Sequence, residues 1–188
     1  MSVVRVFAYG SLIGQPELPD ALLRTTPATL PGWRRSFNKR SRNRGTPVAE
    51  AFAGPTAAGF ERDGHRDSLA LGTEAGGAMV GAVLHYPSEV RDELLARLDR
   101  REGFFPSRPL ASGYVRRRVE VRVEGLPLSA LTYLSNPDPN GAFRVPSTWD
   151  AAARARVLIA ASPREPRDPE WRGLHYLEGV RASLLAAH

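Results

Sequence analysis

Two short stretches of the sequence hold residues that could carry out chemistry. The first is Tyr9-Gly10-Ser11-Leu12, hereafter the Tyr-Gly-Ser-Leu segment, which follows a mostly apolar run. A glycine at such a point lets the chain turn without a Cβ, and successive backbone N–H groups can then converge on a carboxylate or a developing oxyanion. The residues by themselves leave an ordinary turn open as the alternative.

The second stretch contains Glu102, which ends an amphipathic helical pattern and precedes Gly103, Phe104 and Phe105. A carboxyl group beside aromatic side chains loses hydration, which raises its pKa and suits it to act as a base near neutral pH. A glutamate at a helix end is more commonly a surface residue, so the position alone does not identify a catalytic group.

Other reactive chemistry finds little support in the sequence. The absence of cysteine excludes disulfides, cysteine metal sites and cysteine nucleophiles. The histidines, His65, His85, His175 and His188, show no metal-ligand spacing. Ser11 has no G-x-S-x-G context, and neither G-x-G-x-x-G nor a P-loop occurs. We therefore expect neither a metal nor a cofactor.

The charge balance is basic, with a net charge of +6 and a single lysine, Lys39, among the 26 basic residues. Residues 33–44 hold six of these cations and two aromatic side chains. Such a stretch could bind a polyanion, but a solvated strand face with a loop is the interpretation we favour, because no nucleic-acid-binding motif accompanies it. We do not expect nucleic acid as a partner.

The elements that must position these residues follow from periodicity. Strands are predicted at residues 3–8, 28–37, 78–86, 115–123 and 128–134, a loop at 39–47, irregular chain at 51–64, and helices at 88–102, from a capping box at Ser147 to about 161, and at 171–184. Strands and helices do not alternate strictly, which disfavours a doubly wound sheet. We expect one α+β domain over residues 1–188, a small mixed or antiparallel sheet curled toward a β-barrel with flanking helices.

Targeting signals are not evident in the sequence. No apolar run approaches the roughly 18 residues of a membrane span, and the N-terminus lacks the pattern of a signal peptide. We therefore expect no membrane partner and a cytoplasmic location.

Five stretches, taken in order, resemble the γ-glutamylcyclotransferase superfamily and, within it, the ChaC-like branch. They are FAYGSLI at 7–13, RGTP at 44–47, GAV at 81–83, LDRRE at 98–102, followed later by Gly113-Tyr114, and ALTYLSN at 130–136. The resemblance implies the superfamily's small mixed barrel with flanking helices. It also implies the branch's reaction, the cleavage of glutathione into 5-oxoproline and cysteinylglycine.

By this resemblance, the Tyr-Gly-Ser-Leu segment cradles the γ-glutamyl group and Glu102 is the catalytic residue. Arg44, Ser11 and Tyr133 are candidates for binding the substrate's α-carboxylate, and Tyr114 is a candidate for the pocket wall. The chemistry suits a lone carboxylate. The substrate's own α-amine attacks its γ-carbonyl with an effective molarity on the order of 10⁵ M or more. One glutamate can move the protons.

The expected activity is therefore that of a lyase, a γ-glutamylcyclotransferase that acts on a small γ-glutamyl molecule, with glutathione as the leading substrate. A second hypothesis keeps the reaction but changes the released amine, because residues 103–113, with two phenylalanines and two prolines, could form a stiff flap over a different leaving group. A third hypothesis is a non-catalytic module that binds a polyanion through residues 34–44.

Overall fold

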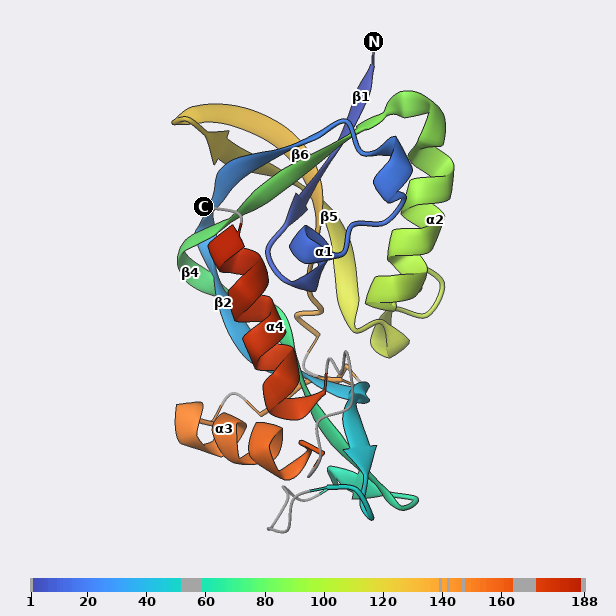
Figure 1. Ribbon diagram of the computed structural model, residues 1–188, viewed down its shortest axis with the longest axis vertical. Helices are drawn as coiled ribbons and strands as arrows, with labels where there is room; N and C mark the ends of the chain where they lie inside the picture. The colour runs from blue at the N-terminus through green and yellow to red at the C-terminus, as the bar shows by residue number, and fades with distance from the viewer. Residues whose placement is uncertain are drawn as a thin grey trace.

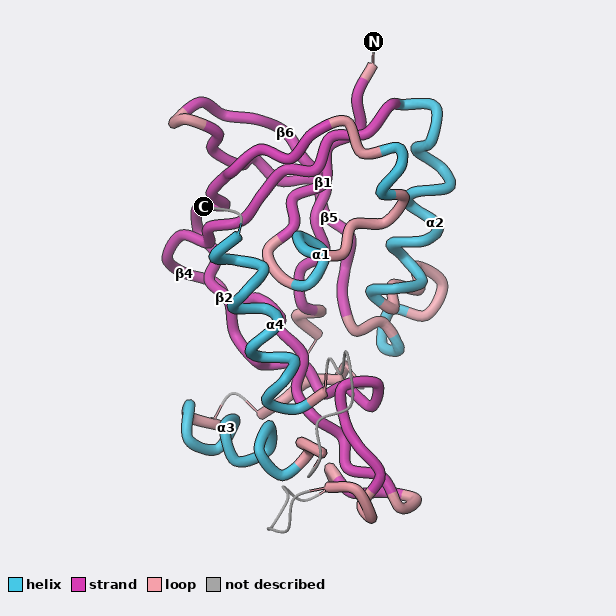
Figure 2. The backbone as a smooth tube through the Cα atoms, in the orientation of Figure 1, coloured by secondary structure: helices cyan, strands magenta, loops and turns pink. Residues whose placement is uncertain are grey.

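The molecule is built on a mixed sheet whose strands close on themselves (Figures 1 and 2). The computed structural model describes residues 2–51, 59–138, 140–141, 143–146, 148–163 and 172–186. Its strands are β1 (Val3–Ala8), β2 (Arg24–Pro47), β3 (Glu61–Arg62), β4 (His65–Pro87), β5 (Tyr114–Val123) and β6 (Leu126–Ser135). They lie in the order β1-β6-β5-β2-β4-β3, and β1 also pairs with β4, so that all strands except β3 form a ring.

The ring mixes both strand orientations. Strand β1 runs parallel to β6 and antiparallel to β4, and the other pairs are antiparallel. A tight turn at Glu124 and Gly125 joins β5 to β6; both residues have positive φ, 50° and 80°, as the twist of a two-residue hairpin requires. Buried apolar side chains pack together against the ring, among them Phe7, Leu30, Met79, Val83 and Val121. The predicted α+β class with a curled mixed sheet is confirmed.

Strands β2 and β4 are much longer than the sequence suggested. The loop predicted at residues 39–47 is wrong, because β2 continues through this polar stretch to Pro47 and pairs with the first part of β4. Three register shifts, between Pro31 and Trp33, Ser36 and Lys39, and Ser41 and Thr46, accommodate residues that suit a regular strand poorly. Figure 1 shows the two strands running on together beyond the ring as a twisted ribbon.

Residues 51–64 were predicted to be irregular. Within them, residues 59–64 include the two-residue strand β3, which pairs with β4 at Arg66 and His65. Residues 52–58 lie outside the described part of the chain.

The helices lie around this sheet. Helix α2 (Arg91–Glu102) buries Leu94, Leu95 and Leu98 and ends at Gly103, whose φ of 62° is left-handed. Short elements complete this side: α1 (Ser11–Gly14), η1 (Pro19–Ala21), η2 (Ser88–Val90) and η3 (Pro109–Ala111). The described residues include no helix that could span a membrane.

Two further helices follow β6 in the chain. Helix α3 (Ala151–Ala160) begins at Asp150, whose carboxylate accepts the N–H of Ala153. The predicted cap, Ser147, lies outside the described residues, as does Trp171 of the predicted C-terminal helix. That helix is α4 (Gly173–Ala186), which lies against β2 and β4 in Figure 1.

Candidate active site

The structure brings together two segments that lie about 90 residues apart in the chain. Glu102 and the Tyr-Gly-Ser-Leu segment line one small cavity of about 40 Å³. The remaining lining residues are Phe7, Ala8, Leu71, Tyr114, Tyr133 and Tyr176. Strand β1 delivers the Tyr-Gly-Ser-Leu segment to this point and the last turn of α2 delivers Glu102.

The Tyr-Gly-Ser-Leu segment leads directly into the single turn of α1. Gly10 has a φ of −146°, outside the left-handed region, so the sequence-based argument from turn geometry does not apply. Space matters instead, because a Cβ at Gly10 would lie 3.1 Å from Cδ2 of Leu71. The N–H groups of Ser11 and Leu12 have no acceptor within the described residues, as expected at the start of a helical turn.

Glu102 is held between desolvation and positive charge. Its side chain keeps about 20% of its exposure, enough to reach a ligand but too little for full hydration. Burial raises the pKa of the carboxyl group, and the charges of Lys39, Arg101 and Arg44 act in the opposite direction. Nε of Arg101 lies 3.8 Å from Oε1 of Glu102.

Arg101 also ties α2 to the chain that follows the Tyr-Gly-Ser-Leu segment. One guanidinium nitrogen donates to the carbonyl of Gln15 at 2.6 Å and to Glu17 at 3.1 Å. The other lies 3.4 Å from the hydroxyl of Ser11. These contacts fix Glu102 relative to Ser11 from the neighbouring position on the helix.

Tyrosines frame the cavity, and their hydroxyl groups bond mainly to the main chain. Tyr9 donates to the carbonyl of Tyr133 at 2.6 Å, and Tyr114 donates to the carbonyl of Leu71. The N–H of Leu71 donates to the hydroxyl of Tyr176 at 3.1 Å. Burial raises the pKa of both Tyr9 and Tyr114, so these groups stay neutral in the working pH range.

Tyr133 and Arg44 are placed less directly than the sequence suggested. The ring of Tyr133 lines the cavity, but its hydroxyl donates to Asp99 at 2.6 Å. Arg44 is not a lining residue. Its guanidinium lies 4.5 Å from the ring centroid of Tyr176, and its charge lowers the pKa of Glu102. Arg44 therefore contributes a positive charge behind the cavity wall.

Sequence reasoning missed Lys39 and Tyr176. Nζ of Lys39 lies 3.7 Å from the ring centroid of Tyr114, and burial lowers the pKa of this amine to about 8, although Glu102 acts the other way. A signal for Lys39 was present, since it is the single lysine of an arginine-rich chain and lysine titrates where arginine does not. Nothing distinguishes Tyr176 from its helical neighbours.

Several other cations of residues 33–44 form ion pairs or hydrogen bonds within the protein. Arg34 pairs with Glu74 at 3.1 Å, Arg40 pairs with Asp67 at 2.5 Å, and Nε of Arg35 donates to the carbonyl of Tyr9 at 2.7 Å. The described residues hold no cluster of His, Cys, Asp or Glu that could bind a metal ion.

Comparison with known proteins identifies the family. Residues 6–151 match the family described as gamma-glutamyl cyclotransferase, AIG2-like. The chain belongs to this family. Its members are γ-glutamyl cyclotransferases, and the protein is an enzyme of that class. A search of curated proteins gave no significant match.

Solved structures show the same fold as this γ-glutamyl cyclotransferase. A selenomethionine form of the yeast γ-glutamyl cyclotransferase specific to glutathione superposes with a TM-score of 0.71 at 19% identity, covering 98% of this chain and 88% of that one. A second structure of the glutathione-specific yeast enzyme gives 0.65 at 19% identity, over 98% and 90%. At this identity the likeness concerns the fold alone.

Proposed function

We propose that this γ-glutamyl cyclotransferase acts on glutathione, releasing 5-oxoproline and cysteinylglycine, and that Glu102 is its catalytic base. The observation that carries the proposal is the shared cavity of Glu102 and the Tyr-Gly-Ser-Leu segment. The ordered motifs of a ChaC-like sequence and the fold of the glutathione-specific yeast enzyme support glutathione as the substrate. A cytoplasmic location stays a prediction.

Proton transfer is the task of the base. The α-ammonium of the γ-glutamyl group must lose a proton before its nitrogen attacks the γ-carbonyl carbon. The leaving nitrogen must gain a proton as its bond to that carbon breaks. A carboxylate whose pKa is raised by burial accepts the first proton near neutral pH and delivers it to the leaving nitrogen. The attacking nitrogen loses a second proton as it becomes the lactam N–H, and the released amine takes this proton up and leaves as an ammonium. Ring closure needs no protein nucleophile, because the attack is intramolecular.

Charge stabilisation is the task of the Tyr-Gly-Ser-Leu segment. Negative charge develops on the γ-carbonyl oxygen during the attack, and the unbonded N–H groups of Ser11 and Leu12 are donors that need not reorganise. The cations beside Glu102, which are Lys39, Arg44 and Arg101, favour binding of the substrate's α-carboxylate nearby.

The test is production of 5-oxoproline. The purified protein is incubated with glutathione and with a panel of γ-glutamyl amines, and 5-oxoproline is measured by mass spectrometry. Glu102→Gln is expected to lower kcat by about 10²–10⁴-fold, because the amide cannot accept the proton. Glu93→Gln, an exposed change of the same kind on the same helix, is expected to retain activity.

The pattern of products distinguishes the substrate, the base and the activity. Product from other γ-glutamyl amines but not from glutathione would correct the substrate. Near-normal turnover by Glu102→Gln would show that the base has been assigned wrongly. No product from any γ-glutamyl compound would reject the proposed activity.

A further inference from the structure

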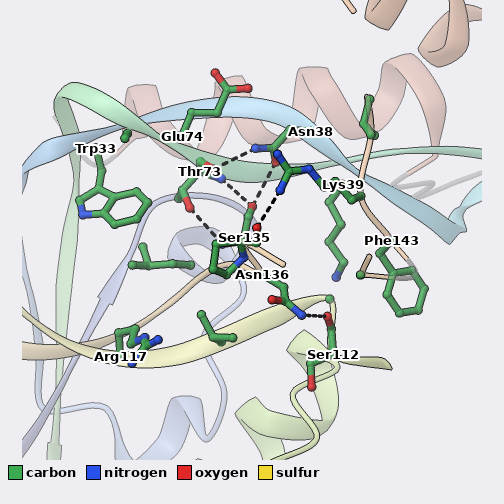
Figure 3. Close-up of a pocket in the computed structure, with 18 of the residues that line it drawn as sticks. Trp33, Asn38, Lys39, Thr73, Glu74, Ser112, Arg117, Ser135, Asn136 and Phe143 are labelled. Carbon is green, nitrogen blue, oxygen red and sulfur yellow. Dashed lines mark hydrogen bonds between the residues drawn. The ribbon is translucent and has the colours of Figure 1, made fainter. Parts of the chain in front are cut away.

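A second hollow in the molecule is a groove of about 660 Å³ (Figure 3). It lies between β2 and β4 on one side and β5 and β6 on the other, where Trp33, Thr73, Arg117 and Ser135 contribute to its walls. Strands β2 and β5 pair with each other at Thr29 and Arg122. Farther along, the two strands diverge, and the groove lies between them there. Its volume is within the range of small-molecule sites.

The polar groups at the floor of the groove form hydrogen bonds with one another. Ser135 Oγ accepts the N–H of Thr73 at 2.8 Å and donates to Asn38 Oδ1 at 3.0 Å. Thr73 Oγ1 accepts the N–H of Ser135 at 3.0 Å. These contacts fix the shape of the groove and leave few polar groups there for a ligand.

The groove is strongly positive. Its described lining residues include five cations, Lys39, Arg117, Arg118, Arg144 and Arg154, and a single carboxylate, Glu74. Glu74 is already paired with Arg154 and with Arg34, each at 3.1 Å. An anionic ligand would therefore meet unbalanced positive charge.

Two of these cations form no polar contact within the described part of the chain. Within the described residues, neither the ammonium group of Lys39 nor the guanidinium of Arg117 has a hydrogen bond or an ion pair. Lys39 instead makes aromatic contacts, at 3.7 Å to the ring centroid of Tyr114 and at 5.7 Å to that of Phe143. Both cations are available to bind a carboxylate, as charge-assisted donors do.

The groove and the cavity of Glu102 meet at a shared wall. Lys39 and Gly113 line the groove, whereas Tyr114, on whose ring Lys39 lies, lines the cavity. A Cβ at Gly113 would overlap Cε of Lys39, so glycine makes room for the amine at this wall. Lys39 is also close enough to Glu102 for its charge to oppose the effect of burial.

We propose that the groove binds the leaving group of the substrate and selects leaving groups that carry a carboxylate, as the C-terminal end of a peptide does. The proposal rests on the proposed function for the reaction itself. Lys39 lies at the inner end, next to the reacting centre, and Arg117 on β5 binds the carboxylate farther along the groove.

The kinetic test compares an acid with its ester. Glutathione and its glycine monoethyl ester share the reacting centre and differ at the distal end, where the ester replaces the charged carboxylate by an uncharged ethyl ester. Arg117→Gln is expected to raise KM for glutathione about tenfold and leave kcat, and the kinetics with the ester, within about twofold, since a lost charge-assisted bond is worth roughly one decade. Arg122→Gln removes the same charge on the same strand outside the groove and should change neither substrate.

A binding measurement separates this proposal from the proposed function. N-acetyl-alanylglycine and its C-terminal amide are titrated into the protein and followed by NMR chemical shifts. The acid is expected to bind more tightly than the amide, and Arg117→Gln, but not Arg122→Gln, should remove the difference. Equal binding of acid and amide, or equal effects of the two variants, would overturn the groove assignment. Selective binding without any 5-oxoproline formation would uphold the groove and reject the activity.

Discussion

Glu102 owes its properties to opposing influences at one carboxyl group. Burial under the tyrosines of the cavity disfavours the charged form, whereas Lys39, Arg101 and Arg44 favour it. The net effect is a raised pKa, and strongly perturbed pKa values cluster at functional sites. A carboxylate whose charged form is disfavoured in this way costs stability, as polar groups at functional sites commonly do.

That cost predicts a pH-dependent gain of stability in Glu102→Gln. The folded protein holds the Glu102 proton more tightly than the unfolded chain, whose carboxyl titrates near the ordinary value of 4.5. The raised pKa of Glu102 therefore adds to the free energy of unfolding of the wild type below pH 4.5. This contribution is lost as the pH rises through the pKa that Glu102 has in the folded protein. Thermal unfolding should show a higher Tm for Glu102→Gln at pH 8 and a smaller difference near pH 4.5.

Glu93→Gln serves as the control, because Glu93 is exposed on the same helix. It should show no such pH-dependent gain. A Tm difference between Glu102→Gln and the wild type that grows as pH falls would contradict the assigned direction of the pKa shift.

The titration of the Lys39 amine can be followed directly, because Lys39 is the single lysine of the chain. Burial lowers its pKa from 10.5 to about 8, so NMR of the ¹³C-methylated amine should show a midpoint near pH 8. Glu102 raises the pKa of Lys39, and Glu102→Gln should lower the midpoint further. Lys39→Arg identifies the signal by removing it. A midpoint near 10.5 would place the amine in water.

At the scale of elements, a bulge aims Lys39. The register of β2 against β4 shifts between Ser36 and Lys39, and from that point Lys39 pairs with Ala70. A bulge redirects the side chains that follow it, and here it turns the amine into the groove. Asn38, within the bulge, donates to the carbonyl of Thr73 at 2.9 Å and secures the shift.

Residues 103–113 form a closed and anchored segment beside the groove. The N–H of Gly113 donates to the carbonyl of Gly103 at 3.0 Å, and the amide of Asn136 donates to the carbonyls of Pro109 and Ser112 at 2.8 and 2.9 Å. Ser112 and Gly113 line the groove. The segment predicted as a stiff flap therefore contributes one end of the proposed leaving-group site.

Gly72 of β4 lies beneath the floor of the groove, where we expect no space for a larger side chain. A Cβ there would overlap Asn38 Oδ1 and Ser135 Oγ, the two atoms that hydrogen-bond to each other across the strands. Gly72→Ala is expected to lower the free energy of unfolding by about 1–3 kcal/mol, as overpacking does. Urea denaturation measures the loss.

A double variant checks the cause of that loss. Ser135→Ala removes one of the two oxygen atoms that the new Cβ would meet. The double change should therefore destabilise the protein by less than the sum of the single changes. Strict additivity would indicate that Gly72→Ala acts through something other than this contact.

At the scale of the whole molecule, one closed ring provides both proposed sites. Pairing of β1 with β4 and β6 places the Tyr-Gly-Ser-Leu segment at an end of the ring, where α2 supplies Glu102. Separation of β2 from β5 opens the groove next to it. The proposed reacting centre and the proposed binding surface for the released amine thus arise from the same set of strands.

The sequence by itself determined what depends on neighbours in the chain. The apolar face of residues 91–102 with Gly103 after it, and the alternation along residues 115–123, predicted α2 and β5. The ordered motifs also indicated the family, and with it Glu102. These features are local because helix and strand periods repeat within a few residues.

Only the tertiary structure decided the continuation of β2 through residues 39–47, the position of Lys39 and the shape of the groove. A polar stretch becomes a strand when a partner strand satisfies its main chain, and that partner, β4, lies farther along the chain. Burial of an amine or a carboxyl group likewise depends on what packs over it. No local pattern records such distant contacts, which is why the chemistry of Lys39 became visible only in the folded molecule.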